Sequence, residues 1–249
     1  METFSLLQTS LDQTISRELL EEASVAVPSV ARADCAHIHR ELFGIVISGL
    51  SREDALAFQA ALAQRNFPTE LIADDDLPVL HESYQIHRVA RRGEVLVLTD
   101  SIGRERVRNV NDLVFLAAGF LNRVHIKTEL HQHLDFGSAR GGGMPKLVTD
   151  REYSEQTESE FRMDFFFWNA PNRLNLTLGK ETVIFHEGEP LRLRNTDGLR
   201  GMMHAMAALL PPERLNSTLR NPDKHLVYPN LPCYEEEIRW HFQRLGAGA

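Results

Sequence analysis

The stretch IVISGLSREDALAFQAALAQRNFPTELI, residues 45–72, decides the fold of the first part of the chain. Its opening apolar run ends at Gly49, and Ser51 lies three residues before Asp54, the spacing at which a serine and a carboxylate cap the first turn of a helix. Apolar residues then recur every three or four positions, which is typical of a helix with one apolar face, and Pro68 follows the end of this pattern. The stretch predicts a strand, a helix and a second strand in immediate succession.

The residues before position 45 enlarge this unit. Residues 4–7 form a short apolar run that predicts a strand, and Ser16 lies where it can cap a following helix. Pro28 interrupts that helix, and residues 31–42 predict a second one. The sequence therefore predicts a small βααβαβ module over residues 1–76.

The segment from Ile47 to Leu62, which begins ISGLSREDA and ends AAL, resembles the strand-to-helix passage in the C-terminal domain of the bacterial ribosomal stalk protein. The Clp protease adaptor shares that element order. The resemblance covers residues 3–72 and implies a small α/β module that docks on other proteins. Stalk proteins present a Gly- and Lys-rich turn between their first two helices, whereas this chain has AVPSVAR at residues 26–32, so binding to translation factors is not implied.

The run of three aspartates at residues 74–76, followed by Pro78, predicts a boundary with an extended and solvated backbone. A site for Ca²⁺ or Mg²⁺ is the alternative, because hard cations bind clustered carboxylates. The alternate spacing of a calcium-binding loop is missing here, which favours the linker. We therefore expect a second domain over residues 77–249.

The second domain is predicted to be rich in strands. Short runs with strand-like composition occur at residues 84–89, 95–99, 104–110, 113–118, 161–168, 174–178 and 182–186. They are followed by an amphipathic helix over residues 196–210, whose methionine stripe we expect to fill the core. This order resembles a pleckstrin-homology-like barrel with a C-terminal capping helix, and a mixed sheet with a packed helix is the alternative. The predicted fold class is α+β.

Two further segments of the second domain have separate expectations. Residues 136–160 contain a glycine run and then a polar stretch, which predicts a long hairpin connection and does not match a phosphate-binding loop. A final helix over residues 234–245 has one apolar face. We expect this helix to cap the second domain, and a homodimer formed through it is the alternative.

One cluster of residues could carry chemistry. On a strand, alternation would place His125, Glu129, His131, His133 and Asp135 on one face. Imidazoles two residues apart beside a carboxylate suit Zn²⁺ or Fe²⁺. The same alternation is also what a half-exposed strand needs without any metal, and we favour that interpretation.

Composition limits the classes of function. The 249 residues carry a formal charge of −8, which opposes a nucleic-acid partner because such binding depends on clustered Lys and Arg. The sequence has neither an 18-residue apolar run nor a basic and apolar leader after Met1, so we expect no membrane insertion and a cytoplasmic location. Of the cysteines, Cys35 and Cys233, each is expected to be a packed thiol.

No catalytic motif accompanies these features. The sequence has neither Gly-x-Ser-x-Gly nor a nucleotide-binding fingerprint before a helix, and no residue stands out as a general acid. We therefore expect a non-catalytic protein, without a cofactor, that binds a protein partner. A metal-dependent enzyme or metal-binding protein that uses His131 and His133 is one alternative. A binder of anionic lipid or of a small molecule at the barrel mouth, near Arg88, Arg91 and Arg92, is the other.

Overall fold

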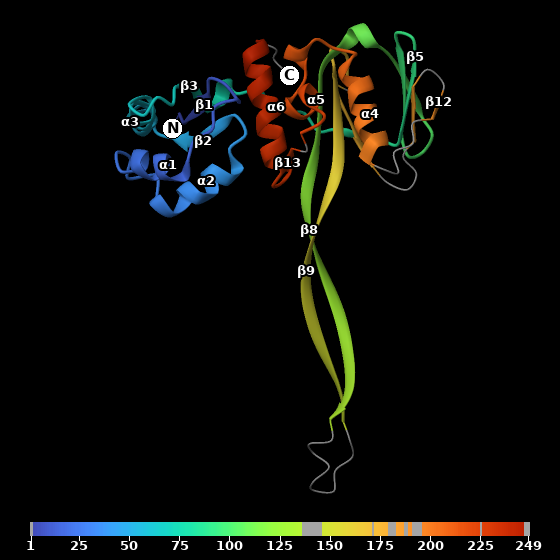
Figure 1. Cartoon of the computed structure of the whole chain (residues 1–249), viewed down its shortest axis with the longest axis horizontal. Coiled ribbons are helices and arrows are strands. Elements are labelled where there is room, and N and C mark those ends of the chain that lie inside the picture. Colours follow the sequence, from blue (N-terminus) through green and yellow to red (C-terminus); the bar gives the residue numbers. More distant parts are fainter. Residues whose placement is uncertain are drawn as a thin grey trace, which may run out of the picture.

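The computed structural model describes residues 2–135, 146–170, 172–178, 183–186, 189–190, 196–224 and 226–246. The architecture is α+β, as predicted, with helices and strands arranged around several sheets. Figure 1 shows a small N-terminal module beside a larger body, from which one long hairpin projects. The module, the body and the hairpin differ in their residue patterns, and each pattern accounts for the local structure of that part.

The N-terminal module has elements in the order strand, helix, helix, strand, helix, strand. Its three strands form one sheet in the order β2-β1-β3, antiparallel throughout. The side chains of Ser16 and Ser51 accept hydrogen bonds from Leu19 N at 3.2 Å and Asp54 N at 3.1 Å, so both cap a helix. The elements are β1 (Phe4–Gln8), α1 (Arg17–Ser24), a 3₁₀ turn (Arg32–Asp34), α2 (Cys35–Glu41), β2 (Ile45–Leu50), α3 (Arg52–Ala63) and β3 (Thr69–Ala73).

In the described part of the body, the strands form two five-stranded sheets, in the orders β13-β8-β9-β10-β4 and β12-β11-β5-β6-β7. The described strands do not close into a barrel, so the pleckstrin-homology-like expectation is not confirmed. The strands are β4 (Tyr84–Ile86), β5 (Arg88–Arg92), β6 (Val95–Thr99), β7 (Glu105–Asn109), β8 (Leu113–Asp135), β9 (Lys146–Phe167), β10 (Arg173–Thr177), β11 (Val183–His186), β12 (Glu189–Pro190) and β13 (Val227–Tyr228). The helices are α4 (Thr196–Ala207), α5 (Ser217–Arg220) and α6 (Leu231–Leu245).

Helix α4 covers one side of the body. Its methionines Met202, Met203 and Met206 are at most 1% exposed and pack in one apolar cluster with residues of both sheets, such as Leu98 and Phe165. The prediction that the methionine stripe fills a core is therefore confirmed. Residues 208–210, which we had placed in the same helix, follow its end as a turn.

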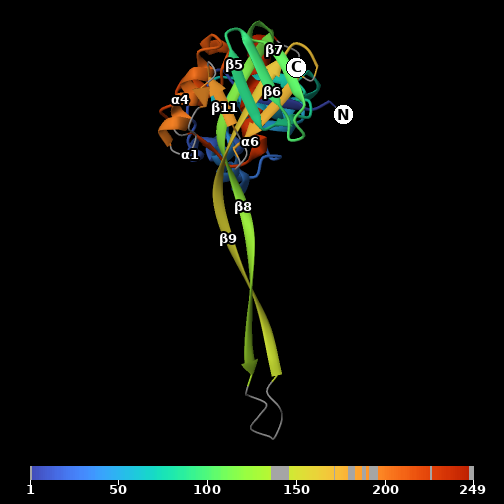
Figure 2. The ribbon, with the colours of Figure 1, turned by 90° about the vertical axis from the view of Figure 1, so that its right-hand side faces the viewer.

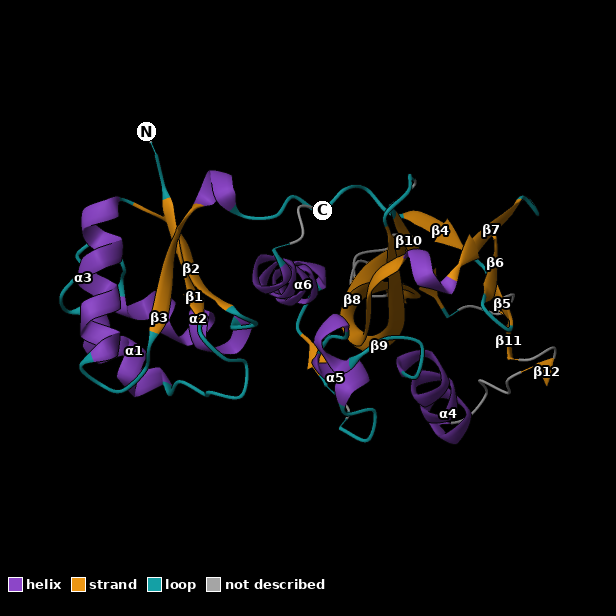
Figure 3. Ribbon diagram, turned by 90° about the horizontal axis from the view of Figure 1, so that it is seen from above, coloured by secondary structure: helices purple, strands orange, loops and turns teal. Residues whose placement is uncertain are grey.

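Helix α6 lies between the body and the module, as the view from above in Figure 3 shows. Toward the body, Tyr234, Ile238 and Phe242 pack against residues of β8 and β9. Toward the module, the Trp240 indole Nε1 donates to the carbonyl oxygen of Gln8 at 2.6 Å. The apolar face of α6 is thus buried inside the chain, as the capping interpretation predicted, and is not free to form the alternative homodimer.

Two predictions about connecting segments are wrong. Asp74–Asp76 form a 3₁₀ turn instead of an extended linker, because the Asp74 carboxylate accepts hydrogen bonds from Ser5 Oγ and from Gly49 N. Residues 146–160 belong to strand β9 and not to a loop. Their polar composition suggested a connection, but a strand that pairs with β8 outside any core needs no apolar residues. Residues 136–145 lie outside the described part of the chain.

Candidate functional site

The most prominent feature is the hairpin formed by the outer parts of β8 and β9, which projects far from the body (Figures 1 and 2). We call residues 122–135 and 146–160 the arm. Its register is continuous, from Asn122 opposite Ser159 to Asp135 opposite Lys146. At about 3.3 Å per residue, each strand of the arm is on the order of 45 Å long.

The edges of the two strands change where the arm begins. Inside the body, β13 pairs with β8 at Phe120 and Leu121, and β10 pairs with β9 between Arg162 and Phe166. Beyond these residues, β8 and β9 pair only with each other among the described strands. Each arm strand therefore presents one outer edge of backbone N–H and C=O groups without a strand partner, the arrangement that usually invites pairing with another chain.

The root of the arm is anchored by buried charges. Asp164 on β9 is fully buried, and it accepts hydrogen bonds from Arg162 Nε at 2.6 Å and from Arg173 Nε at 2.7 Å. Arg173 also pairs with Glu235 on α6 at 2.8 Å. Burial alone would raise the pKa of Asp164, but the two guanidinium groups hold it below its usual value. The cluster joins β9, β10 and α6 in the part of the body from which the arm projects.

A second buried network fixes β8 at the same level. The Asn216 side chain accepts a hydrogen bond from Ala118 N at 3.0 Å and donates to Ala118 O at 2.7 Å, so it completes the edge of β8. Asn216 also donates to the Tyr228 hydroxyl at 3.0 Å, and that hydroxyl donates to Glu237. The absence of a side chain at Gly119 leaves room for the Tyr228 ring, because a Cβ atom at Gly119 would lie 2.4 Å from Tyr228 Cε2.

Arm side chains that the structure describes are polar or exposed. Arg123 Nε lies 2.6 Å from Glu160 Oε2, and Ser159 Oγ donates to Asn122 Oδ1 at 2.9 Å. Leu130, farther out, is 61% exposed. The two arm strands differ in charge: residues 150–160 contain five acidic residues and one basic residue, whereas residues 122–135 contain two of each.

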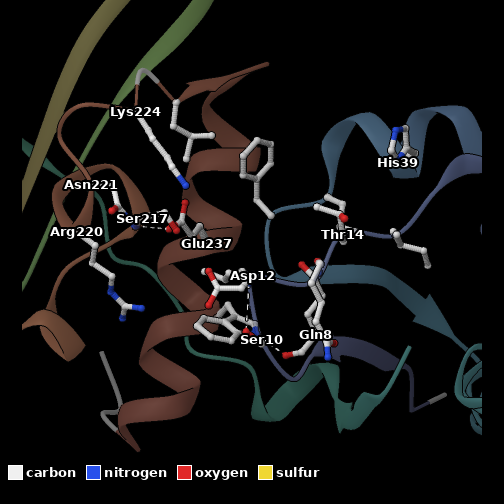
Figure 4. Close-up of a pocket in the computed structure, with 17 residues that line it drawn as sticks. Gln8, Ser10, Asp12, Thr14, His39, Ser217, Arg220, Asn221, Lys224 and Glu237 are labelled. Atoms are coloured by element: carbon white, nitrogen blue, oxygen red, sulfur yellow. Dashed lines mark hydrogen bonds between the residues drawn. The ribbon is translucent and has the colours of Figure 1, made fainter. Parts of the chain in front are cut away.

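A cleft separates the module from the body (Figure 4). It encloses about 410 Å³, with Gln8 and Asp12 on the module side and Arg220, Lys224 and Glu237 on the body side. The Glu237 carboxylate accepts a hydrogen bond from Ser217 N at 2.7 Å. Burial alone would raise the pKa of Glu237, but the neighbouring His241 imidazole and the hydrogen bond from Tyr228 hold it below its usual value. Glu237 is therefore a structural anion, and the described lining shows no pairing of a nucleophile with a base.

The predicted metal residues all lie on β8. The expectation that His125, Glu129, His131, His133 and Asp135 share one strand is confirmed, but their side chains lie outside the described part. Among residues whose side chains are described, no group of three or more His, Cys, Asp or Glu residues gathers. The metal site at His131 and His133 stays a prediction.

The other predicted residues are placed as follows. Arg88, Arg91 and Arg92 lie on β5, and because the described strands form no barrel, the expected barrel mouth has no counterpart among them. Cys35 and Cys233 are buried and unpaired, as expected for packed thiols. Burial raises the pKa of Cys233 to about 12, which makes it a poor nucleophile.

Sequence reasoning predicted a strand in the β8 half of the arm but missed the β9 half and the projecting hairpin. The alternation of Val124, Ile126 and Leu130 with polar residues was the signal for the β8 half.

Comparison of the chain with protein-family models, with curated proteins and with solved structures finds no match to any of them. In the described residues, no helix has the length and apolar character needed to cross a membrane.

Proposed function

We propose that this protein is a non-catalytic docking module that engages a protein partner through its arm. The observation that carries the proposal is the pair of long outer edges that the described structure leaves without a strand partner. A two-stranded hairpin without further strands or a packed helix is only marginally stable in water, so a binding partner would stabilise the arm. The acidic stretch at residues 150–160 favours a protein partner over a nucleic acid.

The body supports this function by holding the arm in one direction. The Asp164 cluster and the Asn216 network hold both strands at the root and connect them to α6 through Glu235 and Glu237. Helix α6 in turn contacts the module through Trp240, and Arg244 pairs with Glu70 at 2.6 Å. This connection suits an adaptor whose module and arm serve different partners.

The same proposal includes the finer sequence expectations. We retain a division at residues 1–76 and 77–249, supported by separate apolar clusters around Phe58 and around Phe165. A docking role for the stalk-like module and a cytoplasmic location belong to the proposal as well. A mixed sheet with a packed helix describes the body better than a pleckstrin-homology-like barrel, because its strands lie in two separate sheets.

Photo-crosslinking from the arm tests the proposed function. A photoreactive amino acid replaces Leu130, which is 61% exposed, and in a matched control it replaces Val25 of the module, which is 84% exposed. Illumination of cells that produce each variant should give discrete protein adducts from position 130 that differ from those at position 25. The absence of any adduct from position 130 would overturn the proposal.

A shortened arm gives an independent test. Deleting residues 124–133 together with 148–157 removes segments that pair with each other residue for residue, so Arg123 stays opposite Glu158 and Leu134 stays opposite Leu147. Thermal unfolding of the body should stay unchanged, because its buried clusters lie outside the deletion. Complexes that the unaltered protein forms through the arm should be lost in the shortened variant, and their persistence would assign binding to another surface.

Elemental analysis separates the metal alternative from this function. The purified protein and a His131→Ala/His133→Ala variant are compared for zinc, iron and manganese. Docking without a metal predicts no stoichiometric metal in either protein. A stoichiometric metal that the double variant loses would replace the proposed function by a metal-binding one.

A further inference from the structure

The free edge of β8 is a defined stretch of backbone. On the body side it begins at Asn122, immediately after the two residues that pair with β13. It continues through the last residue of the strand, Asp135. Residues 122–134 of this edge read NRVHIKTELHQHL, and Thr128 is the middle residue of these thirteen.

The sequence around Thr128 is complementary to itself when it is read in the opposite direction. In an antiparallel pair of such strands centred on Thr128, position 127 lies opposite 129 and position 126 lies opposite 130. Lys127 would then face Glu129 twice, and Ile126 would face Leu130 twice. Cross-strand pairs of opposite charge, of apolar residues and of two threonines each stabilise a sheet.

Within one arm, the register places Glu129 opposite another acidic residue, and a lysine of a second copy would offset this negative charge. Glu129 on β8 lies directly opposite Glu152 on β9, so the register places two like charges at neighbouring positions. A directly opposed pair of like charges destabilises a sheet. In the antiparallel pair centred on Thr128, Lys127 of a second copy would flank Glu129 on its other side.

We propose that two copies of this protein join along the free edges of β8, antiparallel and centred on Thr128, to form a four-stranded ribbon with the order β9-β8-β8-β9. This inference rests on the proposed function and names its partner, a second copy of the chain. The bodies then lie at opposite ends of the ribbon. Pairing stops at position 122, because β13 already occupies the edge of β8 at Phe120 and Leu121.

Competing registers and edges are disfavoured by the same residues. A shift by two positions places either Lys127 opposite Lys127 or Glu129 opposite Glu129. A shift by one position brings the apolar positions opposite polar ones. Pairing through β9 would bring together two copies of its acidic stretch, residues 150–160, whereas the proposed ribbon keeps these strands at its outer edges, where charges oppose further pairing.

Charge reversal tests the pairing. Lys127→Glu and Glu129→Lys each turn both central ion pairs into like-charge pairs, so each variant alone should raise the dimer dissociation constant on the order of tenfold or more. A mixture of the two variants should form a heterodimer, because the reversed charges then match across the copies, and the Lys127→Glu/Glu129→Lys double variant should dimerise again. Sedimentation velocity over a concentration series measures each species.

A matched control for Lys127→Glu is Lys224→Glu, an exposed lysine beside the cleft, which changes the net charge by the same amount but lies outside the arm. It should leave the dimer unchanged. Thermal unfolding of every variant shows that the body remains folded. The proposal is overturned if the unaltered protein is monomeric at every concentration, or if the mixture of single variants is no more associated than either one alone.

Disulfide trapping fixes the register. In the proposed ribbon only position 128 lies opposite itself, at the Cα separation of about 4.5–5.5 Å that a disulfide accepts. Thr128→Cys should crosslink two copies under mild oxidation, whereas Lys127→Cys and Glu129→Cys alone should not. Crosslinking from Leu130 to a different protein, combined with a monomeric chain, would preserve the docking function and reject this partner.

Discussion

The two ends of the same strand pair, β8 and β9, are different structures. Near the body, Phe115 and Phe165 are fully buried, and β13, β10 and the side chain of Asn216 pair with the outer edges of the two strands. In the arm, the strands keep the same continuous register but pair only with each other among the described residues, and Leu130 is 61% exposed. Burial stabilises the first end, whereas the second end is held by backbone pairing and, among the described side chains, by exposed polar contacts such as that between Arg123 and Glu160.

The difference shows that register and stability have separate origins in this hairpin. The body sets the register, because buried residues on β8 and β9 permit only one alignment, and the arm inherits it. Stability does not extend along the strands in the same way, because a two-stranded ribbon removes little apolar surface from water. A partner along the arm would supply the missing surface.

The largest expected effect comes from Asp164→Asn at the root. The substitution removes the carboxylate that binds both Arg162 and Arg173, and among the described carboxylates only Glu235 then still pairs with one of the two buried guanidinium groups, that of Arg173. Breaking such a buried ion pair costs about 3–5 kcal/mol of unfolding free energy. Urea denaturation measures the loss, and Glu158→Gln on the exposed part of β9 serves as the control. Equal stability of the two variants would contradict the distinction between root and arm.

Acid should act on the root in the same direction. The pKa of Asp164 is lower in the folded protein than in the unfolded chain, so its contribution to stability is complete above the unfolded value and is lost as the pH falls through the folded value. The difference in urea midpoint between the natural protein and the Asp164→Asn variant should therefore shrink on acidification below the unfolded pKa. A difference that stays constant at low pH would show that the substitution disturbs the packing instead.

Gly119→Ala tests how closely the root of β8 is packed. The added Cβ would lie 2.4 Å from Tyr228 Cε2, so Tyr228 has to move out of a fully buried position. Overpacking of this kind costs about 1–3 kcal/mol. Gly201→Ala on α4 is the matched control, because a Cβ there meets no atom within 4 Å and alanine favours a helix. Gly119→Ala should lower the unfolding midpoint, and Gly201→Ala should raise it.

Asn216→Ala tests the covered edge of β8 directly. Without the amide, the N–H and C=O of Ala118 lose their partner in a buried site, at a cost of about 1–3 kcal/mol. Asn122→Ala, at the start of the arm, removes only the hydrogen bond from Ser159 and should change the unfolding free energy by less than about 0.5 kcal/mol. Hydrogen exchange at Ala118 should accelerate in the first variant only.

Sequence patterns predicted the parts of the fold in which local signals agree with burial. The cap at Ser51 begins α3, the methionines of α4 fill the core, and the apolar face of α6 is buried within the chain. In each case spacing along the helix matches the face that packs, so the pattern contains the information. The expectation that Cys35 and Cys233 are packed thiols is also confirmed, because both are buried.

The β9 half of the arm could not be predicted in the same way, because a strand of an isolated ribbon does not require alternation of apolar residues. Residues 146–160 are polar and had the composition of a loop, yet the register set at Phe165 and Phe166 continues through them. Likewise, the aspartates at 74–76 looked like a solvated linker, because the hydrogen bond from Ser5 to Asp74 joins residues far apart in the sequence. Local composition does not indicate contacts between residues that are far apart in the sequence.

The smallest effect is expected at the ion pair between Arg123 and Glu160, at the start of the arm. Arg123 is 59% exposed and Glu160 is 25% exposed, so water screens the pair, and exposed pairs contribute about 0.2–1 kcal/mol. A double-mutant cycle with Arg123→Gln and Glu160→Gln should give a coupling energy below about 0.5 kcal/mol that falls further with salt. A coupling as large as that at Asp164 would mean that the arm is anchored beyond its root, and the contrast between the two ends of the hairpin would disappear.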